Sequence, residues 1–161
     1  MHLTVDLEDH TPAAAPSRLA LAIAPLLETL DSRDISATFF VLGETAQHHP
    51  DVVDRIRRSG HEIALHGFSH RLLRDIGPGG LADDLRRGRA MLEELDCTAI
   101  DGYRAPYFSV TRDVPWAPSV ISDEGFLYSS SVLPVWNPQA GYPGAPHTPF
   151  RWPCGLIELP A

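Results

Sequence analysis

Apolar residues along this 161-residue chain follow two alternating patterns, short unbroken runs and longer stretches with helical spacing. The short runs lie at 3–5, 37–42, 62–65, 99–103, 126–128 and 155–159, and the helical spacing occurs at 17–30, 50–60, 81–95 and 114–124. A short apolar run predicts a buried strand, whereas apolar residues three and four positions apart predict a helix with one buried face. Strands that alternate with helices predict βα units and a parallel sheet.

Capping residues mark several of the predicted boundaries. Ser17 offers a hydroxyl as an N-cap, Pro50 suits a first helical turn, and Gly60 suits the end of the same helix. The stretch 134–153 is rich in Pro and Gly, so we expect little regular structure there.

Polar side chains gather where the predicted strands end. They are Asp6, Glu8 and Asp9 after the first strand, His66 and His70 after the third, and Arg104 after the next. In parallel α/β folds, functional sites collect at the carboxyl ends of the strands. We therefore expect these side chains to form one site.

His66 and His70 are four positions apart, which is close enough for two imidazoles to share a metal ion. Two histidines at this spacing also occur by chance on surfaces. The carboxylates expected beside them are what favours a metal site. We do not predict ligands among the other histidines, His10, His48, His49, His61 and His147.

Composition narrows the class of protein. Apolar residues make up 43% of the chain, enough for one domain spanning 1–161 with a single core. The formal net charge of -8 argues against nucleic-acid binding, which needs an excess of basic residues. No apolar run approaches the length of a membrane span, and no secretory signal is visible, so we expect a cytoplasmic protein.

Four sequence blocks, in order, resemble the polysaccharide deacetylase family, also called the NodB-homology group or carbohydrate esterase family four. The blocks are 4–9 (TVDLED), 37–43 (ATFFVLG), 60–70 (GHEIALHGFSH) and 103–108 (YRAPYF). The form of the first block resembles the branch associated with exosortase and exopolysaccharide clusters. The resemblance implies an α/β fold, a distorted and incomplete (β/α) barrel, and an N-acetylated polysaccharide as substrate.

The resemblance also implies residue roles. Asp6 matches the catalytic base, and His66 and His70 match two ligands of a metal triad. The third ligand in the family is a carboxylate near the base; Glu8 is our first choice and Asp9 the alternative, since Leu7 stands where many members carry it.

Two further positions match the family's third motif. Arg104 matches an arginine that orients the base, and Tyr107 matches a position whose backbone N–H stabilises the oxyanion. Two histidines and a carboxylate leave coordination positions for water and the acetyl oxygen. Zinc is the expected ion, with cobalt, nickel or iron as alternatives.

The chain departs from the family at its C-terminal end. The later Leu-x-His motif, whose histidine is the general acid, is missing, and Ser129 stands where many members carry an Asp. We therefore expect the N-terminal two-thirds of a deacetylase domain, with an open edge that a homo-oligomer would cover. Two other functions remain open: a non-catalytic relative that binds metal and glycan, and a hydrolase of small cyclic amides.

Three aromatic residues in the stretch 134–153, Trp136, Tyr142 and Trp152, could stack on sugar rings or form a packed lid. We favour the packed lid.

Overall fold

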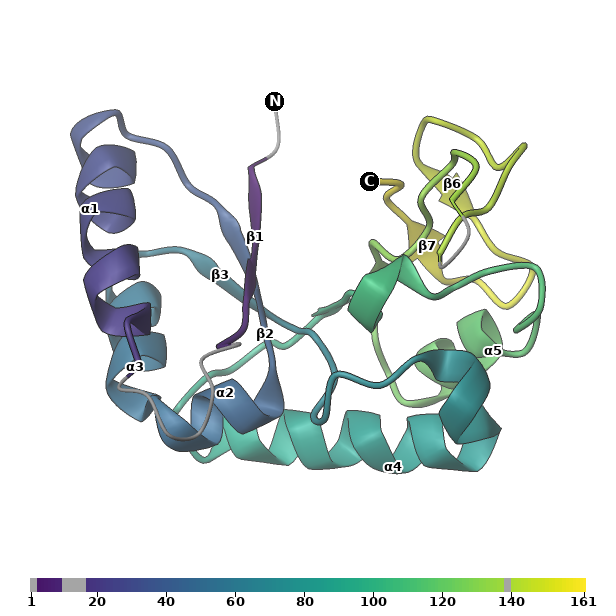
Figure 1. Cartoon of the computed structure of the whole chain (residues 1–161), viewed down its shortest axis with the longest axis horizontal. Coiled ribbons are helices and arrows are strands. Elements are labelled where there is room, and N and C mark those ends of the chain that lie inside the picture. Colours follow the sequence, from purple (N-terminus) through teal and green to yellow (C-terminus); the bar gives the residue numbers. More distant parts are fainter. Residues whose placement is uncertain (1–2, 10–16, 138–139) are drawn as a thin grey trace.

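The computed structural model describes residues 3–9, 17–137 and 140–161, and Figure 1 shows how its elements are arranged. In chain order they are β1 (Thr4–Leu7), α1 (Leu19–Ser32), β2 (Thr38–Val41), α2 (Gly43–His48), α3 (Pro50–Arg58), β3 (Glu62–Leu65), α4 (Leu73–Glu93), β4 (Gly102–Tyr103), the 3-10 turn η1 (Pro106–Phe108), α5 (Ala117–Asp123), β5 (Tyr128–Ser129), β6 (Phe150–Arg151) and β7 (Ile157–Glu158).

All the strands belong to one sheet in the order β1-β2-β3-β4-β5-β7-β6. Neighbouring strands are parallel except β6 and β7, which pair antiparallel. The sheet does not close, because β1 lies at one edge and β6 at the other. The predicted α/β fold with an incomplete barrel is therefore confirmed, whereas the predicted homo-oligomer at the open edge stays a prediction.

Alternating side chains on β1, β2 and β3 divide the sheet into an outer and an inner face. Outward-facing apolar residues join the core under the helices; they are Val5, Leu7, Phe39, Val41, Ile63 and Leu65. On the inner face, the register places Asp6 beside Phe40 and Phe40 beside Ala64. The strand pattern therefore puts the predicted base on the face opposite the main core.

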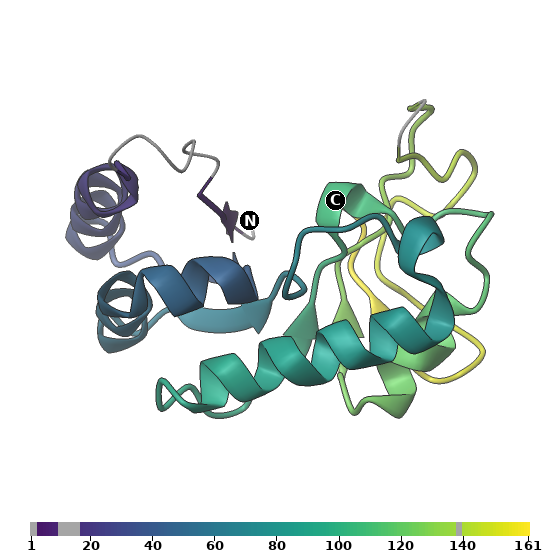
Figure 2. The ribbon, with the colours of Figure 1, turned by 60° about the horizontal axis from the view of Figure 1, so that its bottom comes forward.

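The helices cover the outer face of the sheet, as Figure 2 shows for α4 and its neighbours. Leu85 and Leu92 of α4 are fully buried. Gly88 lets α4 approach β3 closely, because a Cβ at this position would lie 2.6 Å from Leu65 Cδ1. The helix thus braces the strand that leads into His66.

Two helices differ from the sequence prediction. The helix α2 was not predicted, because no element was expected between the strand at 37–42 and the helix at 50–60. Gly43 is required there for space, because a Cβ would lie 2.5 Å from Phe68 Cδ2. The helix α4 begins at Leu73 rather than near 81, and it bends at Gly77, whose φ of 66° and ψ of 179° are not helical.

Smaller differences affect the strand and helix ends. β1 continues through Leu7, so Asp6 lies within the strand rather than after it. The stretch 134–153 contains β6, which forms a hairpin with β7. Ser17 Oγ accepts the Leu19 N–H at 3.2 Å, although the helix itself begins at Leu19.

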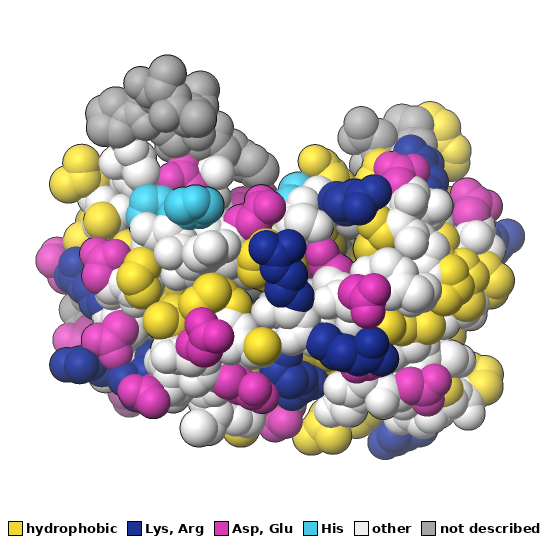
Figure 3. Space-filling model, turned by 90° about the horizontal axis from the view of Figure 1, so that it is seen from below, with side chains coloured by type: hydrophobic (Ala, Val, Ile, Leu, Met, Phe, Trp, Pro, Cys, Tyr) yellow, Lys and Arg dark blue, Asp and Glu magenta, His cyan; other side chains and the backbone are white. Residues whose placement is uncertain are grey.

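The surface seen from below mixes acidic and basic side chains (Figure 3). On α4, Arg86 pairs with both Asp83 and Glu124.

Among the described residues, no helix combines the length and the apolar character that a membrane crossing requires.

Candidate metal centre and active site

A carboxylate and a guanidinium form a direct ion pair on the inner face of the sheet. Asp6 Oδ1 lies 2.7 Å from Arg104 Nη1, although the two residues are far apart in the chain. The Arg104 side chain is 6% exposed and that of Asp6 is 26% exposed. The arginine therefore holds the carboxylate from the buried side, and the carboxylate itself remains open to solvent.

Arg104 is fixed by contacts on three sides. Its Nε donates to the Ser130 carbonyl at 3.0 Å, and its Nη2 donates to Ser130 Oγ at 2.9 Å. The guanidinium also lies 4.1 Å from the centroid of the Phe40 ring. Ser130 was not predicted as a site residue, although it follows a predicted strand as the other polar residues do.

Glu8, His66 and His70 come together beside this pair. Glu8 Oε2 lies 2.5 Å from His70 Nε2 and 3.8 Å from His66 Nε2. One donor atom from each of the three residues lies within 4.8 Å of the other two. The structure thus gathers the two histidines and our first choice of carboxylate.

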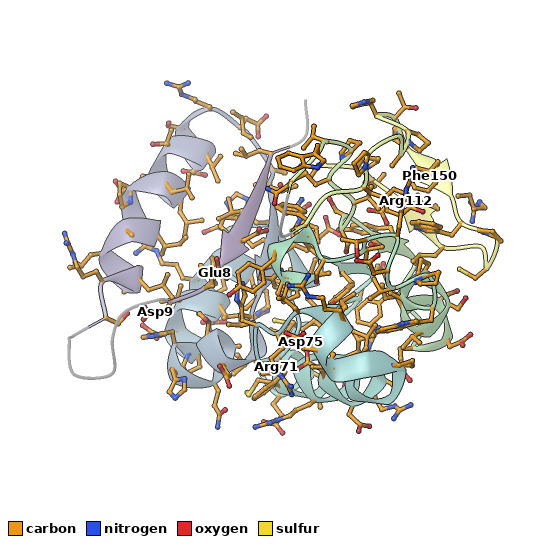
Figure 4. The ribbon with its side chains drawn as sticks, turned by 45° about the vertical axis from the view of Figure 1, so that its right-hand side comes forward. Glu8, Asp9, Arg71, Asp75, Arg112 and Phe150 are labelled. Atoms are coloured by element: carbon orange, nitrogen blue, oxygen red, sulfur yellow. The ribbon has the colours of Figure 1, made fainter. Side chains whose placement is uncertain are left out.

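Asp9, the alternative third ligand, lies in a different contact although it follows Glu8 directly (Figure 4). Its Oδ2 lies 3.1 Å from His49 Nε2, and its backbone N–H donates to Thr45 Oγ1 at 3.2 Å. These contacts tie Asp9 to α2 and favour Glu8 as the ligand. His49 is therefore partly buried.

The hydrogen bond on His66 fixes its tautomer. His66 Nδ1 lies 2.8 Å from the Arg104 carbonyl oxygen, which can only accept, so Nδ1 carries the proton. The lone pair is then on Nε2, the atom nearest Glu8. Burial lowers the pKa of His66, against the opposing attraction of Asp6 and Glu8, which favours the neutral imidazole that a metal ligand needs.

A carboxylate on α4 holds the loop between the two histidines. Asp84 accepts the Phe68 N–H at 2.7 Å, the Ser69 hydroxyl at 2.7 Å and the Ser69 N–H at 3.3 Å. Gly67, with φ of 78°, lets the loop turn, and a Cβ there would lie 2.9 Å from Asp84 Oδ2. Sequence reasoning missed Asp84, which looks like one of several charges on a solvated helix.

Three of the six described non-Gly residues with positive φ lie at this site. Tyr107, Phe108 and His70 have φ values of 58°, 50° and 48°. This left-handed conformation costs about 1 kcal/mol or more for each residue that is not Gly. The conformation at Tyr107 sets the direction of its backbone N–H, and its ring lies 4.5 Å from the His70 ring, centroid to centroid.

The Glu8, His66 and His70 donors fit a divalent cation. Ligand atoms around a tetrahedral zinc lie about 3.3 Å apart, close to the observed 3.8 Å between Glu8 and His66. Glu8 Oε2 and His70 Nε2, at 2.5 Å, are closer than two ligands of one ion, so these two groups would move apart around a bound cation. A set of two imidazoles and one carboxylate suits zinc, and also cobalt, nickel or iron.

The remaining histidines lie elsewhere. His61 is buried against Phe39, His48 is exposed and bonded to the Glu44 carbonyl, and His147 is exposed. His10 lies outside the described residues. None of these three described residues belongs to the cluster of Glu8, His66 and His70.

A cavity of about 410 Å³ lies against the inner face of the sheet and is bordered by Arg104. Its lining includes Thr38, Phe40, Glu62, Arg104, Tyr128 and Leu159. At its far end, Glu62 accepts hydrogen bonds from Tyr128 at 2.8 Å and from Thr38 at 2.5 Å. Burial, and then the hydrogen bond to Glu62, raise the pKa of the Tyr128 hydroxyl.

The aromatic residues of the stretch 134–153 divide into two groups. Tyr142 and Trp152 pack together with ring centroids 6.2 Å apart, as the packed-lid prediction requires. Trp136 is 78% exposed and lines a groove of about 250 Å³ with Arg74 and Arg112. The prediction is therefore correct for two of the three rings and wrong for Trp136.

Comparison with known sequences identifies a family that matches most of this chain. The sequence profile of the family described as "Polysaccharide deacetylase" matches residues 9–120. A peptidoglycan-N-acetylglucosamine deacetylase of Bacillus cereus is 31% identical over 93 residues, which are 57% of this chain and 34% of that protein. The chain thus spans about a third of the length of this relative.

Solved structures share the fold. A candidate polysaccharide deacetylase from Mycobacterium smegmatis superimposes with a TM-score of 0.77 and 29% identity, covering 99% of this chain and 57% of that one. The PuuE allantoinase superimposes with a TM-score of 0.74 over 99% of this chain and 60% of that one. At 17% identity, the allantoinase shows a common fold alone.

Proposed function

Because the chain belongs to the polysaccharide deacetylase family, we propose that its site hydrolyses N-acetyl groups on the amino sugars of a polysaccharide. The observation that carries this proposal is the Glu8, His66 and His70 cluster beside the Asp6–Arg104 pair. The name of the Bacillus cereus relative supports glycans that contain N-acetylglucosamine as the substrate class.

Glu8, His66 and His70 would hold one divalent cation, with zinc as the proposed ion. When bound, the cation would act as a Lewis acid that polarises the acetyl carbonyl and lowers the pKa of bound water. His66 keeps its lone pair on Nε2 because its Nδ1–H donates a hydrogen bond to the Arg104 carbonyl. Each of these three residues therefore serves binding, and none of them is needed to move a proton.

Asp6 acts as the general base that takes a proton from the attacking water. Its contact with Arg104 fixes the direction of the carboxylate. The Tyr107 N–H donates to the oxygen on which negative charge develops, a kind of contact that is typically worth about 3–4 kcal/mol. Uptake of the water proton at Asp6 Oδ and stabilisation of charge by the Tyr107 N–H are thus separate tasks.

The departing amine must also gain a proton. His147 is exposed and does not join the metal-site cluster, so we do not assign it this task. Asp6 would hold the proton that it took from water, and it is the described acid in position to return it. Hydrolysis of a small cyclic amide would use the same residues, but no feature of the site favours it.

The test of the proposed function is metal content by elemental analysis, combined with acetate release from N-acetylglucosamine oligomers. We compare the parent chain with a His66→Ala, His70→Ala double variant and with His147→Ala, which removes an exposed histidine. We expect about one equivalent of metal in the parent and in His147→Ala, and loss of both metal and activity in the double variant.

Two results would change the proposal. Metal binding without acetate release, from any of several acetylated glycans, would favour a non-catalytic relative that binds metal and glycan. Absence of metal in all three proteins after incubation with zinc would overturn the ligand assignment.

A further inference from the structure

Glu158 in β7 is a carboxyl group with no exposed surface, outside the set of residues that any motif indicated. Its Oε1 accepts the backbone N–H groups of Ser131 at 2.7 Å and of Val132 at 2.9 Å. Its Oε2 accepts the Trp152 indole N–H at 3.2 Å. Burial of a carboxylate costs several kcal/mol of hydration, and three N–H donors offset that cost.

The residues that Glu158 holds directly follow Ser130, the residue that holds Arg104. Ser130 accepts two hydrogen bonds from the Arg104 guanidinium, and Ser131 Oγ accepts the Ala105 N–H at 2.8 Å. The segment 130–132 therefore joins Glu158 on one side to residues 104 and 105 on the other. Those two residues directly precede η1, which carries Tyr107.

Strand pairing alone does not explain how this segment is held. β5 ends at Ser129, where the parallel pairing with Glu158 ends as well. The N–H groups of Ser131 and Val132 lie beyond the end of that strand, and the Glu158 carboxylate is the acceptor for both of them. The Glu158 side chain thus supplies the acceptors that a longer strand would have supplied from its backbone.

We propose that Glu158 is a positioning residue for the Asp6–Arg104 pair, acting through the segment 130–132. The inference rests on the proposed function, because its consequence is the alignment of the base Asp6. A shift of about 1 Å in a catalytic group costs on the order of 100-fold in rate. Loss of the Glu158 acceptor would therefore lower kcat while the Glu8, His66 and His70 cluster, which belongs to other elements, keeps its metal.

A purely structural role for Glu158 would work through Trp152 and the β6–β7 hairpin instead. Two variants separate the two roles. Glu158→Leu removes all three acceptor contacts, whereas Trp152→Phe removes only the indole contact and keeps an aromatic ring beside Phe150. Both weaken the hairpin, but only Glu158→Leu frees the segment 130–132.

The experiment measures kcat, KM, metal content and urea unfolding for both variants. We expect Glu158→Leu to lower kcat about 10–100-fold with KM little changed and about one equivalent of metal retained. Trp152→Phe should keep the kcat of the parent although it unfolds at lower urea. Glu158→Gln keeps one oxygen that can accept both backbone N–H groups, so it should recover most of the kcat.

Ser131→Ala is the second variant if Glu158→Leu does not fold. It removes the hydroxyl that accepts the Ala105 N–H and leaves the contacts to Glu158 in place. We expect a fall in kcat of the same kind with little loss of stability. Equal kcat in Ser131→Ala and the parent, or in Glu158→Leu and Trp152→Phe, would overturn the inference.

A spectroscopic measurement of hydrogen exchange tests the inference without relying on activity. The Arg104 Nε–H, identified by its absence in Arg104→Lys, should exchange slowly with solvent in the parent, Glu158→Gln and Trp152→Phe. It should exchange rapidly in Glu158→Leu. A parent without acetate release but with this exchange pattern would contradict the proposed function and support the role of Glu158.

Discussion

The first and second halves of the sheet hold their functional residues by different means. β1, β2 and β3 have four residues each, and every residue of β1 and β2 pairs with the next strand. β4, β5 and β7 have two residues each, with short registers. The first half carries Asp6, Glu8, His66 and His70, and the second half carries Arg104 and Tyr107.

The difference shows two ways of fixing a side chain. In the first half, a continuous backbone ladder sets the register, and the inner-face positions follow from it. In the second half, buried hydrogen bonds of Ser130, Ser131 and Glu158 replace much of that ladder. Substitutions in the first half should therefore remove a functional group directly. Substitutions in the second half should instead displace functional groups from their positions.

The largest effect is expected at Asp6. Asp6→Asn keeps the size of the side chain but removes the base, so kcat should fall by about 10²–10⁴-fold. Metal content should stay at the parent level, because Asp6 is not part of the ligand cluster. Elemental analysis and acetate release measure the two quantities, and a variant that keeps the parent kcat would rule out Asp6 as the base.

Arg104→Met should have the next largest effect, and on stability as well as on activity. It leaves Asp6 and the buried Ser130 acceptors without their partner, and a buried polar group without a partner costs about 1–3 kcal/mol. Urea unfolding measures the change in the free energy of unfolding. Arg55→Met, at an exposed position of α3, is the control and should stay within about 0.5 kcal/mol of the parent.

Asp84→Ala tests the loop that carries the two histidines. It removes the acceptor for the Phe68 and Ser69 donors, so we expect a loss of about 1–3 kcal/mol. Metal affinity should fall about 10–100-fold, as for other residues that orient ligands. Asp83→Ala on the same helix is the control for helix propensity; equal metal affinity in the two variants would contradict a role for Asp84.

The smallest effect concerns His61, which lies at the opposite end of β3 from the site. Burial lowers the pKa of His61 in the folded state, so its neutral form is favoured on folding. The associated stability is complete above the unfolded pKa of about 6.5 and is lost as pH falls toward the folded pKa. His61→Phe should therefore reduce the loss of stability between pH 7.5 and pH 5.

Urea unfolding at the two pH values measures the effect of His61→Phe. The exposed His147→Phe is the matched control and should show the pH dependence of the parent. If both variants follow the parent, burial of His61 does not contribute to the acid sensitivity of this fold.

The predicted elements match the structure best where one periodic pattern is complete. The strand predicted at 62–65 is β3 with the same bounds. The start of α4 was missed because Gly77 and Pro78 interrupt the helical pattern, although the helix bends and continues there. β6 was missed because two residues carry no period that could be recognised.

Among the site residues, the sequence by itself determined the chemical groups available. A parallel sheet brings strand ends together, and five groups lie in or near such ends: Asp6, Glu8, His66, His70 and Arg104. Their catalytic and ligand roles stay predictions until metal and activity are measured.

Only the tertiary structure decided which other residues hold these site residues in place. Asp84, Ser130 and Glu158 are ordinary polar residues in the sequence, and each acquires its task from donors 15 or more positions away. Local patterns report which face of an element is apolar. They do not report which backbone N–H groups a loop leaves without a partner, because that depends on how the loop packs against the rest of the chain.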